Sequence, residues 1–255
     1  MIVLKSPQEI KAMRKAGQVV ARVLAKLGEM IRPGITTGAL DRAAEDLLRE
    51  WGAVPAFKGY RPEHARTPFP ASICTSVDNQ VVHGIPGPRV LQEGQIVSID
   101  VGAIVDGFCG DAARTFPVGE ISPEAARLLV VTEEALEKGI ERARVGNRLS
   151  DISHAIQQWV EAHGFSVVRE LVGHGIGRQM HEPPPVPNAG PPGRGPRLKP
   201  GMVLAIEPMV NAGAYGVKTK ADGWTVVTED GSLSAHFEHT VAITADGPQI
   251  LTSLS

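Results

Sequence analysis

The sequence contains one series of landmarks twice. Residues 91–100 and 198–207 both follow the pattern Leu-x-x-Gly-x-apolar-apolar-x-Ile-acid, and they end at Asp100 and Glu207. Ahead of each segment two glycines lie 18 residues apart: Gly34 with Gly52, and Gly146 with Gly164. Glycine before an apolar strand is common by itself, but three landmarks in one order favour two related halves over coincidence. The fold must then hold two equivalent strands that each end in a carboxylate.

Each half is predicted to begin with two amphipathic helices. Ser6-Pro7-Gln8-Glu9 has the residues of a capping box with proline at the first helical position, and apolar spacing continues this helix to about Gly28. A second helix is predicted to end at Trp51-Gly52. In the other half, Ser122-Pro123-Glu124 begins a helix, and the apolar stripe of the next helix ends at His163-Gly164.

Apolar strands follow each helix pair, so the predicted fold class is α+β. We expect a two-half antiparallel β-sheet covered by helices, with a pseudo-twofold relation between the halves. We expect one domain over residues 1–255, with repeated halves at about 6–120 and 121–248. A cleft between related halves is a natural place for a functional site, and the two acid-tipped strands are expected to meet there.

Charge and composition exclude several classes of partner. With a net charge of −2 and no basic tail, the chain has no electrostatic reason to bind DNA or to bind RNA tightly. It has no apolar run long enough for a transmembrane helix, and Met1–Lys5 is too short for a leader, so we expect no membrane association. Two cysteines, Cys74 and Cys109, are too few for a disulfide scaffold and favour the reducing cytoplasm.

Two aspartates lie on a predicted hairpin in the first half. Asp106-Gly107, between apolar pairs, is a strong signal for a two-residue turn. Counting outward from this turn, Gly102 faces Asp111, so Asp100 lies one diagonal step from Asp111 on the same face of the sheet. Two buried carboxylates so close raise the pKa of one of them unless a cation lies between them. The pair is therefore either a metal site or an acid/base dyad.

Three more stretches supply candidate ligands. Gly173-His174-Gly175-Ile176-Gly177 places an imidazole where the backbone can approach a ligand closely. Glu207 ends an apolar strand, and Glu238 lies at the start of another, which we expect opposite Gly223-Trp224-Thr225. Taken singly, such a histidine is more often a satisfied polar residue and such a glutamate is usually solvent-facing. Together, four carboxylates and one imidazole match a dinuclear centre of divalent ions and disfavour a structural zinc site.

The positions Asp100, Asp111, His174, Glu207 and Glu238 resemble the metal set of the pita-bread metallopeptidases. The local motifs are closer to the type I methionine aminopeptidases: Gly-Asp-x-x-Arg-Thr-Phe at 110–116, Gly-His-Gly-Ile-Gly-x3-His-Glu at 173–182, then Ile-Glu-Pro-Met and Glu-His-Thr. This resemblance extends from the first helix to about Pro248. It implies the pita-bread fold and a monomer. Because the interval from His181 to Glu238 has no room for the helical insertion of type II members, it implies the short bacterial form.

The resemblance also implies roles in a metal-dependent hydrolase. Asp100 would chelate one divalent ion and His174 the other, while Asp111 and Glu238 bridge them. The cofactors would be two divalent ions, and oxygen ligands with one nitrogen accept cobalt, manganese, iron or zinc.

Three residues are implied to act on the reaction itself. Glu207, also a metal ligand, would be the general acid/base for the ion-bridging water that attacks the first peptide bond. His83 would contact the scissile amide nitrogen, and His181 would stabilise the carbonyl oxygen. Without the resemblance, we would interpret His83 as a hydrogen-bonded turn residue.

The implied substrate is the initiator methionine of a nascent polypeptide whose second residue is small. A thioether pocket is expected to be apolar, aromatic and polarisable. The residues that match this pocket are Phe57, Tyr60, Phe69, Cys74, Met180 and Trp224. The alternative is that several of them simply fill the core. Phe57 and Met180 stand where some bacterial members have Cys and Phe.

Several positions have no assigned role at this level. His236 stands where an amide or a similar polar residue is expected, and we interpret Cys109 as a small buried filler. The irregular segment 61–70 is expected to form a rim loop. The Pro/Gly-rich segment 183–200 is expected to form an ordered loop over the site, although its composition also suits a linker or a polyproline docking segment.

Two other functions compete. Another pita-bread peptidase, such as prolidase or aminopeptidase P, usually has an additional N-terminal domain and follows the equivalent of Glu207-Pro208 with glycine, where this chain has Met209. A non-catalytic pita-bread binding protein would be expected to have lost ligands, and all of them are present here. The partners implied for a methionine aminopeptidase are nascent N-termini and a transient association with the ribosome.

Overall fold

A computed structural model describes residues 1–62 and 67–254 of the chain. Within these ranges there are four α-helices: α1 (Pro7–Met30), α2 (Thr37–Glu50), α3 (Pro123–Arg142) and α4 (Leu149–Ala162). The strands of the first half are β1 (Val54–Pro55), β2 (Ile73–Val77), β3 (Gln80–Val82), β4 (Ile96–Val105) and β5 (Phe108–Pro117). The first strands of the second half are β6 (Ser166–Val167), β7 (Gly173–Gly175), β8 (Glu182–Val186), β9 (Val203–Ile206) and β10 (Met209–Asn211). The last are β11 (Val217–Thr219), β12 (Val226–Thr228), β13 (Ser234–His236), β14 (His239–Thr244) and β15 (Gly247–Ile250). No helix in the described ranges is long and apolar enough to cross a membrane.

The helix boundaries follow the local signals. The Ser6 backbone N–H donates to Glu9 Oε2 (2.9 Å) and the Ser6 hydroxyl accepts from the Glu9 backbone N–H (3.3 Å), which confirms the capping box of α1. Ser122 caps α3 in a similar way, by accepting from the Ala125 N–H. The sequence predicted that α1 ends at about Gly28, but the helix continues for two more residues to Met30.

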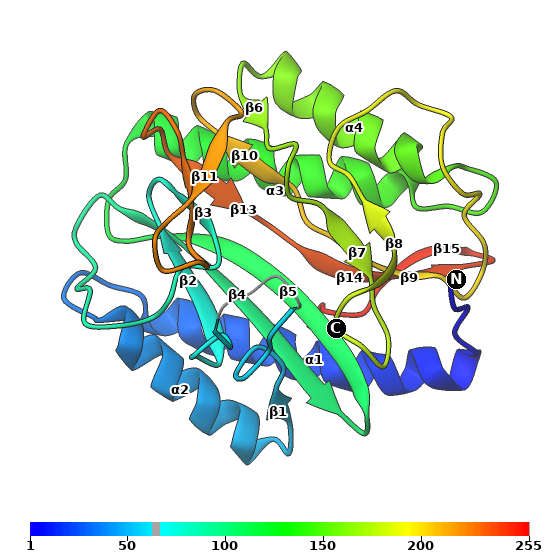
Figure 1. Cartoon of the computed structure of the whole chain (residues 1–255), viewed down its shortest axis with the longest axis horizontal. Coiled ribbons are helices and arrows are strands. Elements are labelled where there is room, and N and C mark those ends of the chain that lie inside the picture. Colours follow the sequence, from blue (N-terminus) through cyan, green and yellow to red (C-terminus); the bar gives the residue numbers. More distant parts are fainter. Residues whose placement is uncertain (63–66, 255) are drawn as a thin grey trace.

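The strands form four separate sheets among the described residues, and every pairing is antiparallel. The largest sheet has the order β15-β14-β9-β7-β8. In a second sheet β4 pairs with β1, β2 and β5. One small sheet, β11-β12-β3, joins strands from both predicted halves. In Figure 1 the α1–α2 pair lies on one side of the strands and the α3–α4 pair on the other. The predicted α+β class with helix-covered antiparallel sheets is confirmed, while the division into halves at 6–120 and 121–248 stays a prediction.

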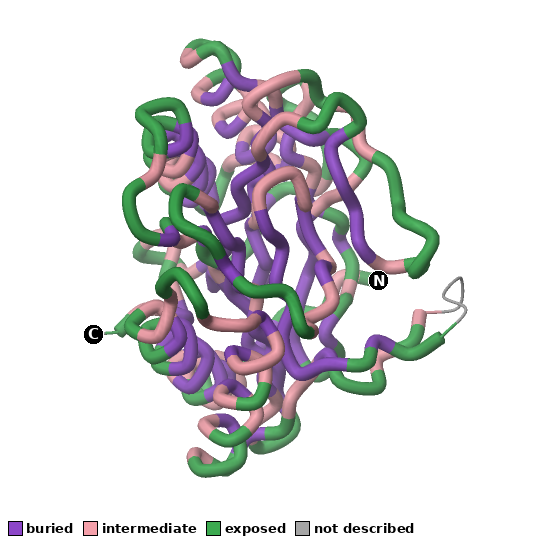
Figure 2. The backbone as a smooth tube through the Cα atoms, turned by 90° about the vertical axis from the view of Figure 1, so that its left-hand side faces the viewer, coloured by how far each residue is buried: buried purple, intermediate pink, exposed green. Residues whose placement is uncertain are grey.

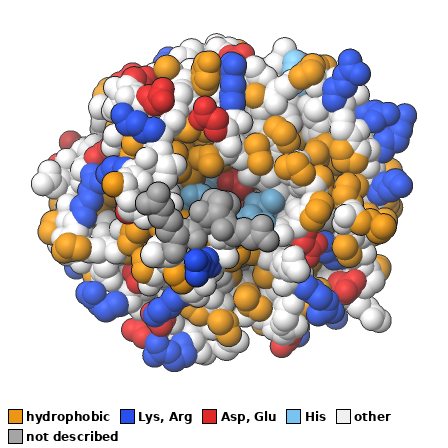
Figure 3. Space-filling view, in the orientation of Figure 1, with side chains coloured by type: hydrophobic (Ala, Val, Ile, Leu, Met, Phe, Trp, Pro, Cys, Tyr) orange, Lys and Arg blue, Asp and Glu red, His pale blue; other side chains and the backbone are white. Residues whose placement is uncertain are grey.

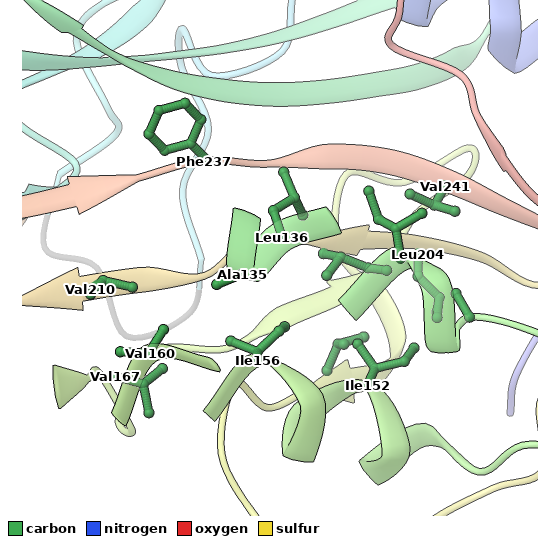
Figure 4. Close-up of a cluster of buried hydrophobic side chains, with 14 of the residues drawn as sticks. Ala135, Leu136, Ile152, Ile156, Val160, Val167, Leu204, Val210, Phe237 and Val241 are labelled. Atoms are coloured by element: carbon green, nitrogen blue, oxygen red, sulfur yellow. The ribbon is translucent and has the colours of Figure 1, made fainter. Parts of the chain in front are cut away.

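Each helix pair buries its own apolar cluster. Ile152 and Ile156 of α4 pack with Leu136 of α3 against strand residues that include Leu204 and Val241 (Figure 4). A second cluster joins α1 and α2 to the β4–β5 hairpin. The tube in Figure 2 shows buried backbone through the centre of the molecule. Truncating one of these large side chains to alanine typically costs about 2–5 kcal/mol, so both clusters contribute strongly to the stability of the fold.

The β4–β5 hairpin has the predicted register. Val105 is opposite Phe108 and Gly102 is opposite Asp111. Asp106 and Gly107 both have positive φ, 52° and 76°, as a tight hairpin turn requires. The strand does not end at Asp100 but continues to Val105, so Asp100 lies in the middle of β4.

The expected pairing of the Glu238 segment with 223–225 was wrong. Asp222 Oδ1 accepts hydrogen bonds from the backbone N–H groups of Trp224 and Thr225 (both 2.9 Å), so this segment is closed on itself as a turn. β13 pairs with β10, β14 pairs with β9 and β15, and Glu238 lies between β13 and β14. The strand that follows the turn at 230–231 is therefore β13, which pairs with β10 and not with residues 223–225.

The Pro/Gly-rich segment 183–200 is an ordered loop, as expected, and its Asn188 Nδ2 donates to Glu207 O (3.0 Å). It begins within β8, which pairs with β7. It then runs along the start of α4, where the Leu149 N–H donates to Pro196 O (3.0 Å) and the Ser150 N–H donates to Arg194 O (3.2 Å). These backbone groups at a helix start lack partners within the helix, which explains why the loop docks there.

Candidate metal centre

Five side chains from separate strands converge at the centre of the molecule. Asp100 lies on β4, Asp111 on β5 and His174 on β7, while Glu207 directly follows β9 and Glu238 directly precedes β14. Ligand atoms of Asp111, His174 and Glu238 lie within 4.8 Å of one another. His174 Nε2 is 3.7 Å from Asp111 Oδ2 and 3.7 Å from Glu207 Oε1. The structure thus brings together the residues that the sequence grouped, and their roles stay predictions.

The carboxylates repel one another in a buried place. Burial raises the pKa of Asp100 to about 7. Burial, followed by the charges of Glu238 and Asp100, raises the pKa of Asp111 well above its usual value. Burial and neighbouring carboxylates raise the pKa values of Glu207 and Glu238 in the same way. Such a cluster is unstable in its charged form unless a cation compensates it.

Unpaired oxygen atoms point to the same need. Asp100 Oδ1, Asp111 Oδ1 and Glu238 Oε1 are buried and have no hydrogen-bond partner within the described part of the chain. Such atoms are costly unless they bind an ion. The His174 Nδ1–H donates to Gly175 O (2.9 Å), which directs the Nε2 lone pair towards the carboxylates, and burial lowers the pKa of His174 to about 3. Oxygen ligands with one neutral imidazole fit a divalent transition-metal ion.

Two further histidines line the cavity beside these acids. The His181 ring lies 4.3 Å from the His174 ring and 5.2 Å from the Tyr60 ring, centroid to centroid. His83 has a left-handed backbone (φ 58°), and burial lowers its pKa to about 4. Gly84 follows it where a Cβ would lie 2.1 Å from Thr75 O, so only glycine allows the turn that presents His83 to the cavity.

The cavity has a volume of about 450 Å³. In Figure 3 imidazole and carboxylate side chains lie at the bottom of a hollow with hydrophobic side chains around it. Five of the six predicted pocket residues line it: Phe57, Tyr60, Phe69, Cys74 and Trp224. Pro62 and Phe69 of the predicted rim segment also line it, while residues 63–66 of that segment lie outside the described ranges.

Met180 does not belong to the described lining of this cavity. Its Cε and the Phe57 ring both lie against Gly102, where a Cβ would meet them at 2.5 and 2.6 Å. Met180 therefore packs in the apolar cluster with Phe57 and supports the pocket wall from outside the lining. Cys109 is buried in this same cluster, in agreement with its interpretation as a filler.

Sequence reasoning missed several lining residues. They are apolar or small: Val82, Leu171, Val172, Met209, Thr219, Gly223 and Val226. The sequence could have indicated Met209, because it lies two positions after the candidate ligand Glu207. The others come from small edge strands and loops whose inward faces no local pattern reveals.

His236 completes the buried polar group. Its Nε2 lies 3.7 Å from Glu207 Oε2 and 4.0 Å from Glu238 Oε2, and this nitrogen has no hydrogen-bond partner among the described residues. The sequence identified this position as a departure from the expected amide. The structure places an imidazole edge against two of the candidate ligands.

Comparison with known proteins identifies the family of this site. The model of metallopeptidase family M24 matches residues 11–245. The chain belongs to metallopeptidase family M24. It is 61% identical over 252 residues to a methionine aminopeptidase of Clostridium perfringens, with 99% of each protein covered. Its structure matches that of the Thermotoga maritima methionine aminopeptidase with a TM-score of 0.96 and 47% identity, covering all of both chains.

The M24 assignment confirms the predicted pita-bread fold and the resemblance to methionine aminopeptidases. The prolidase of Pyrococcus furiosus has the same fold, with a TM-score of 0.80 and 22% identity, but this chain covers only 66% of that longer protein. That likeness concerns the fold alone. Membership of a metallopeptidase family, together with the buried acid cluster, also supports the predicted use of divalent metal.

Proposed function

We propose that this M24 chain is a methionine aminopeptidase that removes the initiator methionine from polypeptides with a small second residue. The observation that carries this proposal is a buried acid cluster with unpaired oxygens on the wall of an apolar cavity. The chain is 58% and 61% identical to two methionine aminopeptidases over nearly its whole length, which supports the same substrate class.

We assign the ligands as the sequence predicted: Asp100, Asp111, His174, Glu207 and Glu238. Two divalent ions would bind there, drawn from cobalt, manganese, iron and zinc. When bound, such ions polarise the peptide carbonyl and lower the pKa of water.

The remaining steps belong to residues around the ligands. The Glu207 carboxylate takes the proton of the attacking water and passes it to the leaving amine. The His181 imidazole lies beside His174 at 4.3 Å between ring centroids, from where it can donate to the carbonyl oxygen as negative charge develops. His83 also lines the cavity, with its ring 6.3 Å from that of Trp224 between centroids, and would contact the amide nitrogen of the bond that breaks.

The apolar part of the cavity would hold the methionine side chain. The Phe69 and Trp224 rings meet edge to face at 5.2 Å between centroids, and Cys74 adds a polarisable sulfur next to Asp100. Thioethers pack well against aromatic edges and soft atoms. The pocket is therefore suited to an unbranched, sulfur-containing side chain.

The remaining parts of the proposal concern the cellular setting. We infer that the protein acts as a monomer in the cytoplasm on nascent N-termini, with a transient association with the ribosome. These points rest on the likeness to methionine aminopeptidases.

Peptide cleavage distinguishes the proposed function from its competitors. The Mn²⁺-loaded protein is expected to cleave Met-Gly-Met with kcat/KM at least 100-fold higher than for an X-Pro dipeptide. The comparison uses one preparation whose metal content is measured in parallel. Preference for X-Pro would favour a prolidase-like enzyme. Absence of both activities and of bound metal would favour a non-catalytic binding protein.

Replacing His83 with alanine is expected to lower kcat by about 100-fold, the usual cost of removing one stabilising contact from a reacting group. Metal affinity is expected to stay within about threefold of the wild type, because His83 contacts the substrate amide and not the ions. Steady-state kinetics and metal titration on the same protein check this. A loss of metal binding parallel to the loss of rate would contradict the assignment.

A further inference from the structure

The facing residues of β5 and of the segment 236–240 form a ladder across the two halves. Figure 1 shows β5 beside the strand path of β13 and β14. Asp111 contacts Thr240, Ala113 contacts Glu238, and Thr115 contacts His236. Each step moves two residues along both segments in opposite directions, which is the spacing of an antiparallel pair.

Only the middle step of this ladder is a backbone hydrogen bond. The Glu238 N–H donates to Ala113 O at 2.9 Å. At one end the Thr240 hydroxyl donates to Asp111 O (2.7 Å) and accepts from the Asp111 N–H (3.0 Å). The Thr240 side chain thus makes both hydrogen bonds that the backbone of a facing residue would make with Asp111.

The other end repeats the arrangement with the halves exchanged. The Thr115 hydroxyl donates to His236 O (2.9 Å) and accepts from the His236 N–H (2.9 Å). Because its one proton is used, the Ser98 hydroxyl at 2.8 Å is the donor to Thr115. Each half therefore supplies one threonine that holds the backbone of the other.

These contacts are dry. Thr115, Thr240, Asp111 and Glu238 are each at most 4% exposed. Water cannot replace a lost hydroxyl without new space, so removing it leaves a buried N–H and a buried C=O unpaired. Loss of the Thr240 hydroxyl leaves the backbone of Asp111 unpaired. Loss of the Thr115 hydroxyl leaves the backbone of His236 unpaired, two residues before Glu238.

We propose that Thr240 and Thr115 are positioning residues that set the separation of the Asp111 and Glu238 carboxylates. This inference rests on the proposed function, in which both acids would hold the ions. Asp111 and Glu238 come from different halves, and the ladder ties their backbones together on neighbouring steps, where Asp111 faces Thr240 and Glu238 faces Ala113. Residues that orient metal ligands typically change metal affinity 10–100-fold when removed.

Thr240→Val removes the hydroxyl with little change in shape. We expect this variant, stripped with chelator and titrated with Mn²⁺ by calorimetry, to bind the tighter ion at least tenfold more weakly than the wild type. Thr240→Ser keeps the hydroxyl and is expected to remain within about threefold. Amide hydrogen exchange at Asp111 should accelerate in Thr240→Val and not in Thr240→Ser. Thr115→Val repeats the test at the other end, with the exchange measured at His236.

Thr132→Val is the matched control. Thr132 is fully buried and donates to Leu128 O (2.7 Å) inside α3, so its loss removes a buried hydroxyl bond away from the ladder. It is expected to lower thermal stability without changing Mn²⁺ affinity.

Three results would overturn the inference while leaving the proposed function intact. They are wild-type Mn²⁺ affinity in both ladder valine variants, an equal loss of affinity in Thr132→Val, and failure of both ladder variants to fold, which would show that the hydroxyls serve the fold as a whole. If the wild type itself bound no Mn²⁺, the proposed function and the inference would fall together.

Discussion

Glu207→Gln is expected to lower kcat/KM on Met-Gly-Met by about 10³-fold or more while the fold is preserved. General acid–base groups contribute typically 10²–10⁴-fold, and glutamine cannot accept the proton of the attacking water. Glutamine matches glutamate in size, and its oxygen can still face His174, which lies 3.7 Å from Glu207 Oε1. Part of the metal site is therefore expected to survive. The measurement combines steady-state kinetics, metal content and circular dichroism.

Glu29→Gln is the control for this substitution. Glu29 is an exposed residue of α1 that pairs with Lys26 and does not line the cavity. Glu29→Gln is expected to leave kcat/KM unchanged, since an exposed ion pair of this kind contributes little to stability. Unaltered turnover in Glu207→Gln would exclude Glu207 as the general base.

Removing metal is expected to abolish cleavage and to change how stability depends on pH. In the metal-free protein the pKa of Asp100 is raised to about 7, and the pKa values of Asp111, Glu207 and Glu238 are raised as well. At these four acids the folded state then binds more protons than the unfolded state above about pH 4, whereas the buried histidines, whose pKa values are lowered, have the opposite effect. The stability that comes from these protonated groups is present at low pH and is lost as the pH rises through the raised pKa values.

Bound divalent ions remove this loss, because they compensate the charged carboxylates. At 100 times its Kd, a ligand stabilises the folded state by about 2.7 kcal/mol, which corresponds to a Tm increase of about 5–10 °C in a chain of this size. We therefore expect the gap between Mn²⁺-loaded and chelated protein to be larger at pH 8 than at pH 5.5. Calorimetric scans at both pH values measure it. A gap that is no larger at pH 8 than at pH 5.5, or a chelated protein that cleaves Met-Gly-Met at full rate, would contradict a metal site at these acids.

Features with short-range causes were predictable from the sequence. The capping box at Ser6, the turn at 106–107 and the facing of Gly102 and Asp111 each depend on residues within one hairpin or helix turn. Predictions that needed a distant partner were less secure. The 223–225 segment was wrongly paired because the closure of its turn by Asp222 competes with strand pairing. The 183–200 segment also docks on the start of α4, and composition does not show that this helix start offers it unpaired backbone groups.

The sequence by itself determined the α+β class and which acids and imidazole to group, because periodicity, turn residues and motif order can be read along the chain. Only the tertiary structure decided that Thr240, 129 residues from Asp111, holds the backbone of that acid, and that Met180 supports the pocket wall without lining it. Contacts of this kind arise when distant parts of the chain pack together. Their geometry depends on the shapes of many buried side chains at once, which no local pattern encodes.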